Sequence, residues 1–591
     1  MESLYCAGEW RPPQVHLPRF HSDLYGGQLE ASVTLDVASR ELSSQVKFDF
    51  DAHRIKQLLT PASRKWLQQF TWTTPPHVTS EARLVLPAWT NAQPDWRREV
   101  LPTVELAGRF EGGASAFRGI PVSAASSHFI FTNFVWHLPD LQVHRPEGSA
   151  KLDYTGHMLT RDYHWVINSR IDPKALEPVL EESQLRALEL FEFSGPPTIR
   201  GDVWGRWMKR ELVGFAGEIR ATNFTFRGEH CDELTSGLSF ANLVLSFTNA
   251  QVLRDGRYVK ATAGAYDFPE KVVLLTNAIS TMDPDLVAKV IGPRIREAIR
   301  PYRFTDPPTV RVNGQVPTKN IDQADLHFEI AGSRFNYWKF HVPQVSGDVF
   351  WRGDLLSVTN VHASFYNGQL DWEGEFYFSA PVGTDFRFRG LVKDVDLHLL
   401  MADLSPTTNQ LEGTVTGNLV IAKANSENWR SWNGFGDVSL QDGFLWNIPI
   451  FGFLSPVSNK LIPGLGQSRA SAASATFTID QSVIHTSDLE VRSAALRLQY
   501  EGSVDFAGTV DARMQAEILR DVWAVGPVVS LALWPLSKVF EYKISGPLAE
   551  PKSEPLYIPR LLFFPFRPFK TLRDIFSENE PAPPLKDKPP N

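Results

Sequence analysis

The chain has 591 residues, roughly four times the length of an ordinary domain, which predicts several domains or one repeated array. Its formal net charge of −8 argues against a nucleic-acid-binding protein, because such proteins present a basic surface to phosphates. Hydrophobic residues make up 43%, with 39 Gly and 42 Pro, a composition that excludes disorder and a coiled coil and favours many short strands.

The first fifty residues alternate with the period of a half-buried β-strand. Leu29, Val33 and Leu35 share one face of the stretch 28–37, and Phe48 and Phe50 share one face of 46–50. Such alternation is typical of an antiparallel sheet with one face in water. No signal peptide opens the chain, and its first residues resemble the middle of a β structure. We therefore expect an upstream segment to precede it.

One pattern recurs three times and predicts a repeat. An Asp at 51, 172 or 283 is followed by apolar residues at offsets 4, 7 and 8, and 24 residues later by a Pro-Pro pair at 75, 196 or 307. These offsets mark the buried stripe of a helix, the Asp is a typical N-cap, and Pro-Pro ends the helix. The predicted helices cover 52–70, 173–191 and 284–301, and a fourth covers 523–540. We expect the first three to occupy equivalent places in successive units.

The Pro-Pro pairs suggest the domain boundaries. They divide the chain into a partial first β repeat, a second and a third β repeat, a large C-terminal region, and an aromatic-basic segment with a Pro-rich tail that should be disordered. In that order the predicted ranges are 1–75, 76–196, 197–307, 308–557 and 558–591.

The search for catalytic chemistry finds no motif of a hydrolase, a nucleotide-binding loop or a metalloprotease. The stretch His230–Glu233 reads as a surface loop rather than a metal site, because four adjacent residues point in different directions. The acidic stretch Glu177–Glu192 reads as a solvated helix face, and His128, His137 and His144 read as structural. We therefore expect no enzyme activity, no metal and no cofactor.

Four stretches in the C-terminal third carry a family resemblance. They are VDLHLLMADLSPTTNQLEGTVTGNLVI from Val395, GFGDVSLQDGFLWNIPIFGFLSPVSNKLIPGLG from Gly434, ATFTIDQSVIHTSDLEVRSAALRLQYEGSVDFAGTVD from Ala475 and WPLSKVFEYKISGPLAEPK from Trp534. Their order resembles the C-terminal region of AsmA-like proteins, relatives of the TamB and YhdP envelope proteins. The resemblance covers residues 390–560 and is looser over the repeats before them.

The resemblance implies a mainly β protein, built as an elongated, twisted antiparallel sheet curled into an apolar groove, with short helices between repeat units. It also implies a place in the bacterial periplasm or envelope, associated with the inner membrane if an N-terminal anchor precedes this start. Relatives are thought to carry phospholipid between the inner and outer membranes and to support outer-membrane biogenesis. The implied partners are lipid, the surfaces of these membranes and other envelope proteins, with no nucleic acid.

Apolar strand faces alone favour an ordinary β-sandwich. If the strands form one continuous sheet, however, the four predicted helices cannot cover its whole apolar face. Three functions then compete: a lipid-conducting groove, an envelope assembly factor whose closed core binds partner proteins, and a polymer-active enzyme, for which no carboxylate ladder is visible. The predicted groove lining comprises Leu29, Val33, Leu35, Phe48, Phe50, Phe386, Phe388, Leu496, Leu498, Val510 and Met514.

The segment 561–576 combines aromatic and basic residues. Pro565 and Pro568 exclude a regular helix in its first half, so it is either a strap over the end of the last sheet or an interfacial anchor. The side chains predicted to contact a membrane or a partner are Phe563, Phe564, Phe566, Arg567, Phe569 and Lys570.

Overall fold

The computed structural model describes residues 3–557 apart from 181, 292–295, 297–301, 320–322, 338, 405–410, 445–469, 494–495, 519–539 and 549. Within this part, hydrogen bonds join 32 strands into one antiparallel sheet, and three further strands form a small second sheet. The predicted mainly β, antiparallel class is therefore confirmed. The large sheet is not closed into a barrel, because among the described strands the first pairs only with the second and the last only with the one before it.

The chain divides into two compact units, Met1–Ser280 with Pro317–Lys319 and Thr281–Val316 with Asn320–Asn591. The strands of unit 1 that belong to the large sheet are β1 (Ser3–Arg11), β2 (Gln14–Leu24), β3 (Gly27–Asp36), β4 (Glu41–Phe48), β6 (His77–Val85), β7 (Glu105–Gly112), β10 (Ala124–Thr132), β11 (Val135–Arg145), β12 (Gly148–His157), β13 (Asp162–Ser169), β14 (Phe191–Phe193), β15 (Thr198–Arg206), β16 (Lys209–Phe226), β17 (Glu229–Ala241), β18 (Val244–Arg254), β19 (Arg257–Asp267) and β20 (Val272–Ser280). The small sheet comprises β5 (Phe70–Trp72), β8 (Ser115–Phe117) and β9 (Ile120–Val122).

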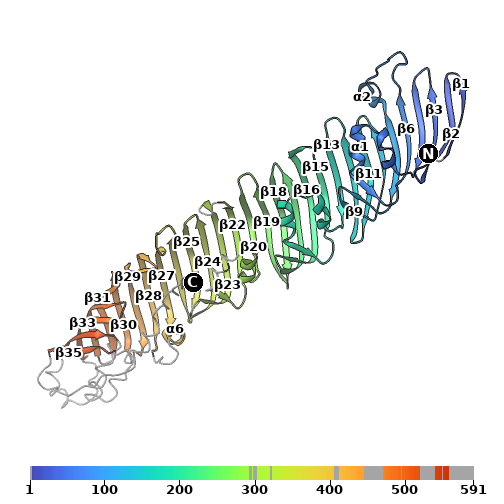
Figure 1. The fold of residues 1–591 in the computed structure, drawn as a ribbon. Helices are drawn as coiled ribbons and strands as arrows, with labels where there is room; N and C mark the ends of the chain where they lie inside the picture. Colours follow the sequence, from blue (N-terminus) through green and yellow to red (C-terminus); the bar gives the residue numbers. More distant parts are fainter. Residues whose placement is uncertain are drawn as a thin grey trace, which may run out of the picture. The chain divides into compact units, whose positions relative to one another are not determined.

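Unit 2 continues the same antiparallel pattern. Its strands are β21 (Tyr302–Phe304), β22 (Thr309–Pro317), β23 (Asp325–Tyr337), β24 (Phe340–Arg352), β25 (Leu355–Phe365), β26 (Gly368–Tyr377), β27 (Asp385–Asp396), β28 (Thr414–Asn425), β29 (Asn428–Gly443), β30 (Ala470–Asp480), β31 (Val483–Ser493), β32 (Leu496–Asp505), β33 (Thr509–Ile518), β34 (Phe540–Pro547) and β35 (Lys552–Tyr557). Figure 1 shows these strands side by side, with β24, β28 and β33 among those labelled.

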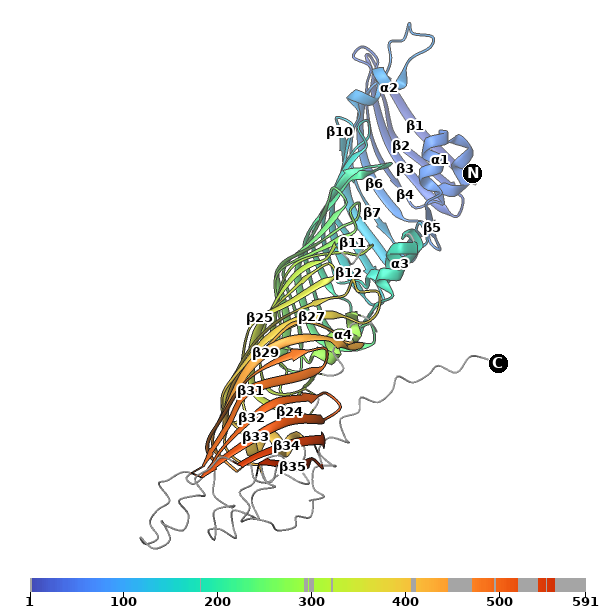
Figure 2. The same ribbon diagram turned by 90° about the vertical axis from the view of Figure 1, so that its left-hand side faces the viewer.

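β-Bulges interrupt the strand pairing of unit 1 at several places. The register shifts between Leu17 and Phe20 where β2 meets β3, and between Leu138 and Leu141 where β11 meets β12. An extra residue in one strand bends that strand and increases its twist. Figure 2 shows the resulting curved strands of unit 1, with α1 (Pro61–Leu67) and α3 (Glu182–Leu188) on the same side of them.

Helices stand where the repeated pattern predicts them, but each of the first two is split. The predicted helix 52–70 is a 3-10 helix, η1 (Ala52–Leu58), followed by α1, and 173–191 is η3 (Pro173–Val179) followed by α3. The split in the first has a local cause, since Thr60 caps α1 by accepting a hydrogen bond from Ser63 N at 3.2 Å and Pro61 occupies its first turn.

Further helices lie elsewhere in the described part of the chain. α4 (Pro284–Ile291) begins the third predicted helix, and the predicted helix at 523–540 lies almost entirely outside the described residues. Two short helices, α2 (Trp96–Glu99) and η2 (Leu101–Thr103), follow β6. Neither these two nor α6 (Leu397–Leu404) was predicted. α6 follows β27 directly after Asp396, whose carboxylate accepts a hydrogen bond from Leu399 N at 3.1 Å.

Asp51 caps η1 and also ties it to the small sheet. Its carboxylate accepts hydrogen bonds from His53 N at 3.1 Å and from Trp72 Nε1 at 3.2 Å. Asp51→Ala is expected to lower the free energy of unfolding of the full chain by about 1–2 kcal/mol, because both donors lose their acceptor. Chemical denaturation measures the loss, and Asp51→Asn, which keeps one acceptor oxygen, should recover part of it. Equal stability of Asp51→Ala and the unmodified chain would contradict the capping role.

Candidate functional site

The strongest feature of unit 1 is the apolar face of its sheet. The pairing register puts the predicted residues Leu29 and Phe48 directly opposite each other, and Val33 and Leu35 follow on the same face of β3. The residues that share this face on β3, β4, β6 and β7 are Leu29, Ala31, Val33, Leu35, Leu42, Ser44, Val46, Phe48, Val78, Ser80, Ala82, Leu84, Leu106, Gly108 and Phe110. None of them carries a charge.

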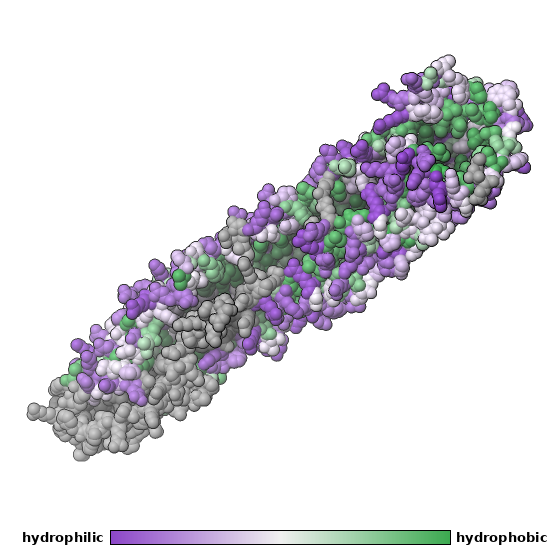
Figure 3. Space-filling view, in the orientation of Figure 1, coloured by the Kyte–Doolittle hydropathy of each residue, from purple (hydrophilic) through white to green (hydrophobic). Residues whose placement is uncertain are grey.

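These side chains are only half-buried. Leu29, Val33, Leu35 and Phe48 all keep part of their surface in contact with solvent, whereas a packed sandwich interior would cover them. Figure 3 shows a hollow in the N-terminal unit with hydrophobic side chains inside it and hydrophilic side chains along its margins. Unit 1 therefore presents a continuous apolar surface that no described element of this unit fully covers.

The opposite face of the same strands is charged. Lys47 lies 3.9 Å from Glu30, and Arg83 lies 3.1 Å from Glu41, each pair across neighbouring strands. A trough of about 1090 Å³ lies at these strands, and its lining includes Glu30, Lys47 and Arg109 of the charged face together with Val46 and Phe129 of the apolar face. The charged and the apolar side chains of these strands therefore lie on opposite sides of one sheet.

Farther along unit 1 the apolar face becomes an aromatic floor. Tyr154 and Trp165 are paired across β12 and β13, with their ring centroids 4.3 Å apart. A Cβ atom on Gly156 would lie 2.1 Å from the Tyr154 hydroxyl, and one on Gly205 would lie 2.6 Å from the Tyr163 hydroxyl, so both phenol rings lie flat over glycines. Burial raises the pKa of both tyrosine hydroxyls, which therefore stay neutral and extend the uncharged surface.

The other predicted lining residues occupy different surroundings. Phe50 follows the end of β4, is 7% exposed and packs against Phe48 with ring centroids 5.1 Å apart. In unit 2, Phe386 and Phe388 lie on one face of β27 and pack beside the small cluster of Ile421, Ala424 and Ile479.

The C-terminal part of unit 2 has a closed core. Leu498 and Met514 are 0% exposed and Val510 is 3% exposed. They belong to a cluster that also contains Leu440, Ala470, Val491, Tyr500, Ala512, Ala516 and Ile544. Leu496 begins β32, and its side chain lies outside the described residues, as do all six side chains predicted in the segment 561–576. The predicted lining residues therefore divide between an open face and a covered one.

A polar latch fixes α6 to the sheet of unit 2. The Asp403 carboxylate accepts a hydrogen bond from the buried Tyr366 hydroxyl and lies 2.6 Å from His341 Nδ1. Tyr366 lies in a turn and has a positive φ of 45°, a conformation that is costly for an aromatic residue. Its hydrogen bond to Asp403 helps to hold it in this conformation. Burial, followed by the contact with Asp403, raises the pKa of Tyr366 well above its usual range.

The latch predicts a dependence of stability on acid. Burial pushes the pKa of Asp403 up, but hydrogen bonds from Tyr366 and His341 outweigh burial and leave it below the ordinary 3.8. A carboxyl group with a depressed folded pKa contributes stability above its unfolded pKa and loses it as the pH falls through the folded value. The free energy of unfolding should therefore exceed that of Asp403→Asn by about 1–2 kcal/mol above pH 3.8, and the difference should shrink below it. Urea titrations at several pH values measure this difference, and a difference that grew in acid would contradict the latch.

Two of the three histidines pair with carboxylates of neighbouring strands. His128 pairs with Asp140 at 2.8 Å and His137 with Asp153 at 3.1 Å, both between neighbouring strands. The prediction that His230–Glu233 forms a surface loop was wrong, because all four residues lie within β17. This strand begins at Glu229, which pairs with Phe226 of the adjacent strand. Among the described residues, no group of three His, Cys, Asp or Glu side chains is placed to hold a metal ion.

The acidic stretch 177–192 spans η3, α3 and β14, and its described residues Glu182, Glu189 and Glu192 are exposed, as a solvated face requires.

No family model matches the chain, and no curated protein is significantly similar to it in sequence. None of the described helices is both long enough and apolar enough to cross a bilayer.

Proposed function

We propose that the chain is a non-enzymatic lipid-binding protein that holds the acyl chains of phospholipid along the apolar face of unit 1. The observation that carries the proposal is the uncharged, half-buried surface that extends across β3, β4, β6 and β7. Each methylene that moves from water onto such a surface contributes about 0.8 kcal/mol and needs no directed polar partner. Acyl chains are therefore a better match than a polar substrate.

The curled groove and the envelope location belong to the same proposal. The order of glycine and apolar motifs in residues 390–560 resembles AsmA-like proteins, and this resemblance supports transport of phospholipid between the inner and outer membranes. Lipid tails would lie in the groove while headgroups stay in water, so that the passage is passive along the protein. The charged opposite face of the sheet supports an aqueous surrounding for that side.

Lipid extraction and native mass spectrometry of the purified full chain test the proposal. Co-purified phospholipid that exchanges with added vesicles is the expected result. A protein that purifies without lipid and takes up none from phospholipid vesicles would overturn it.

A second candidate function is that of an envelope assembly factor that binds partner proteins and carries no lipid. Strand β1 favours it, because among the described strands it pairs only with β2, and Leu4, Tyr5 and Trp10 are 52%, 56% and 54% exposed there. An unpaired strand edge with exposed large side chains is a typical site for strand addition by a partner.

The segment after Tyr557 bears on contact with a membrane. Truncation at this residue removes Phe563, Phe564, Phe566 and the neighbouring cations. Lost liposome binding with an unchanged melting temperature would support the interfacial anchor. A large loss of thermal stability would support the strap.

A further inference from the structure

A hairpin of unit 1 reaches from one margin of the sheet to the opposite one. β8 and β9 are inserted between the end of β7 and the start of β10, at the margin that carries η1 and η3. The turn between them places the Arg118 guanidinium carbon 5.4 Å from the ring centroid of Trp207, which follows β15 at the other margin. Trp207 N donates a hydrogen bond to Arg161 O at 3.0 Å, which fixes the tryptophan to that margin. The contact therefore bridges the apolar face.

The charge of Arg118 has little compensation. Its Nε donates to Gln69 Oε1 at 2.6 Å, and its guanidinium also lies 5.3 Å from the ring centroid of Phe117. Within the described part of the chain, no carboxylate forms an ion pair with Arg118 and no side chain accepts from its terminal nitrogens. Aromatic faces satisfy an exposed cation only weakly.

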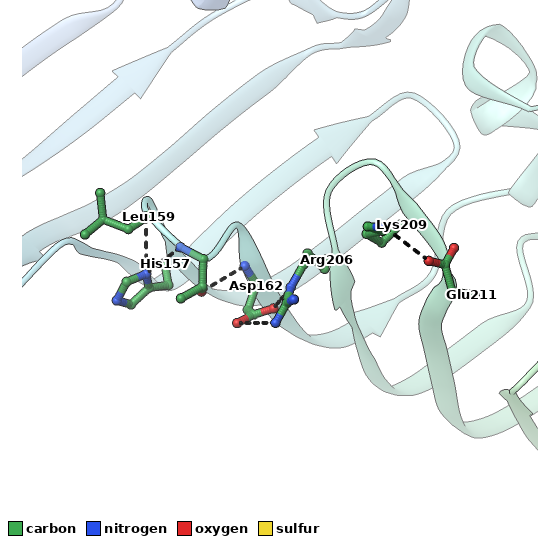
Figure 4. Close-up of polar contacts among 7 residues, drawn as sticks. His157, Leu159, Asp162, Arg206, Lys209 and Glu211 are labelled. Atoms are coloured by element: carbon green, nitrogen blue, oxygen red, sulfur yellow. Dashed lines mark hydrogen bonds and ion pairs between the residues drawn. The ribbon is translucent and has the colours of Figure 1, made fainter.

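Three cations near the bridge, Arg145, Arg206 and Lys209, differ from Arg118 in this respect. Arg206 donates hydrogen bonds of 2.7 and 3.4 Å to Asp162, and Lys209 lies 3.8 Å from Glu211, as Figure 4 shows. Arg145, beside β9, is paired with Glu147. An anion approaching this part of unit 1 would have to compete with a carboxylate at each of these three sites, but not at Arg118.

The surface beneath the bridge is uncharged and aromatic. Trp207 lies 4.8 Å from Tyr163 between ring centroids, directly beside the aromatic floor. The floor comprises Tyr154, Gly156, Tyr163, Trp165, Val203 and Gly205. A cation at the margin of such a surface can pair with the charged headgroup of an amphiphile, while the apolar surface contacts its acyl chains.

We propose that Arg118 binds the anionic headgroup, phosphate or carboxylate, of an amphiphile whose acyl chains lie on this floor. The inference rests on the proposed function for the acyl chains and adds the class of headgroup and its site. A bidentate pair between a guanidinium and an anion is stronger than a guanidinium–ring contact, so the headgroup displaces Trp207 and opens the bridge. Trp207 is then a competitor of the ligand rather than one of its contacts.

A second turn of the same sequence provides a matched control. Phe226, Arg227 and Gly228 repeat Phe117, Arg118 and Gly119, and both arginines adopt a φ of 50° before a glycine with positive φ. The Arg227 guanidinium carbon lies 5.8 Å from the Phe226 ring centroid. Arg227→Gln removes the same charge from the same kind of turn.

The experiment compares capture of acyl-labelled phosphatidylglycerol, phosphatidylcholine and diacylglycerol, matched in chain length, by the full chain and its variants. Arg118→Gln is expected to weaken capture of phosphatidylglycerol about tenfold and to leave diacylglycerol unchanged, since only the charge contact is lost. Arg118→Lys should recover part of the loss, Arg227→Gln should cause none, and Trp207→Leu should retain or strengthen capture. Millimolar inorganic phosphate should not displace the labelled lipid, because it lacks the acyl contacts.

The outcomes separate the two proposals. If the full chain captures none of the three lipids, the proposed function fails. If all three lipids bind and Arg118→Gln binds phosphatidylglycerol as well as before, the headgroup site is wrong while the proposed function stands. If Trp207→Leu loses phosphatidylglycerol as strongly as Arg118→Gln, the bridge is a structural strap and the competition is wrong. Displacement by inorganic phosphate alone would indicate a free-phosphate site and overturn the lipid headgroup.

Discussion

Val33→Glu is expected to remove most of the bound lipid while leaving the protein folded. Val33 lies on the uncovered apolar face, with Leu17 opposite it on β2 and Ser44 opposite it on β4. Its side chain is half-buried, so a glutamate there can extend its carboxylate to water at a cost of about 1 kcal/mol or less. An acyl chain laid over the same position would bury that carboxylate at a cost of several kcal/mol, enough to lower lipid occupancy by more than about tenfold.

The matched control is Ser32→Glu, one residue earlier on the charged face. Ser32 pairs with Gln45 across β3 and β4, so the added carboxylate joins a face that already carries Glu30 and Lys47. Phospholipid that co-purifies with each variant is counted by mass spectrometry, and folding is followed by thermal unfolding. Ser32→Glu should match the unmodified chain in both measurements. Unfolding of Val33→Glu without any change in lipid per folded molecule would instead indicate a closed core.

Much of the fold follows from local features of the sequence, namely strand alternation and helix caps. The alternation of Leu29, Val33 and Leu35 specifies both the strand and the face, because a one-residue slip would move every side chain to the other side. The cap at Asp51 locates the start of η1 for an equally local reason. Such features depend on neighbours within a few residues of the chain, and they can therefore be predicted from the sequence.

Features that depend on contacts between distant segments of the chain cannot be predicted from the local sequence. Nothing near Arg118 in the sequence indicates contact with Trp207, and only the chain reversal between β8 and β9 brings them together. α6 escaped prediction because its eight residues follow a strand without a break, although Asp396 is a usable cap. Alternation also cannot tell an open face from a covered one, so Val33 and Met514 were predicted to share one role.

Met514→Asp is expected to have the opposite effect to Val33→Glu, the loss of folded structure in the C-terminal part of unit 2. Met514 is 0% exposed, lies between Tyr500 on β32 and Tyr542 on β34, and belongs to the closed core. An aspartate at this position has no path to water and meets no cationic partner in the described core cluster. Burial of the unpaired carboxylate should cost several kcal/mol, a large fraction of the 5–15 kcal/mol that stabilises a typical folded domain.

Gln515→Asp makes the same substitution one residue later, where the side chain is exposed on the opposite face. The new carboxylate lies near Glu541, but repulsion between exposed charges across two strands costs only a few tenths of a kcal/mol. Met514→Leu conserves the volume of the core and should cost less than about 1.5 kcal/mol. Protection of the β32–β34 amides in hydrogen exchange measures all three variants, and protection should be lost in Met514→Asp alone. Retained protection in that variant would mean that water reaches the core, and the face carrying Met514 would then be open like that of unit 1.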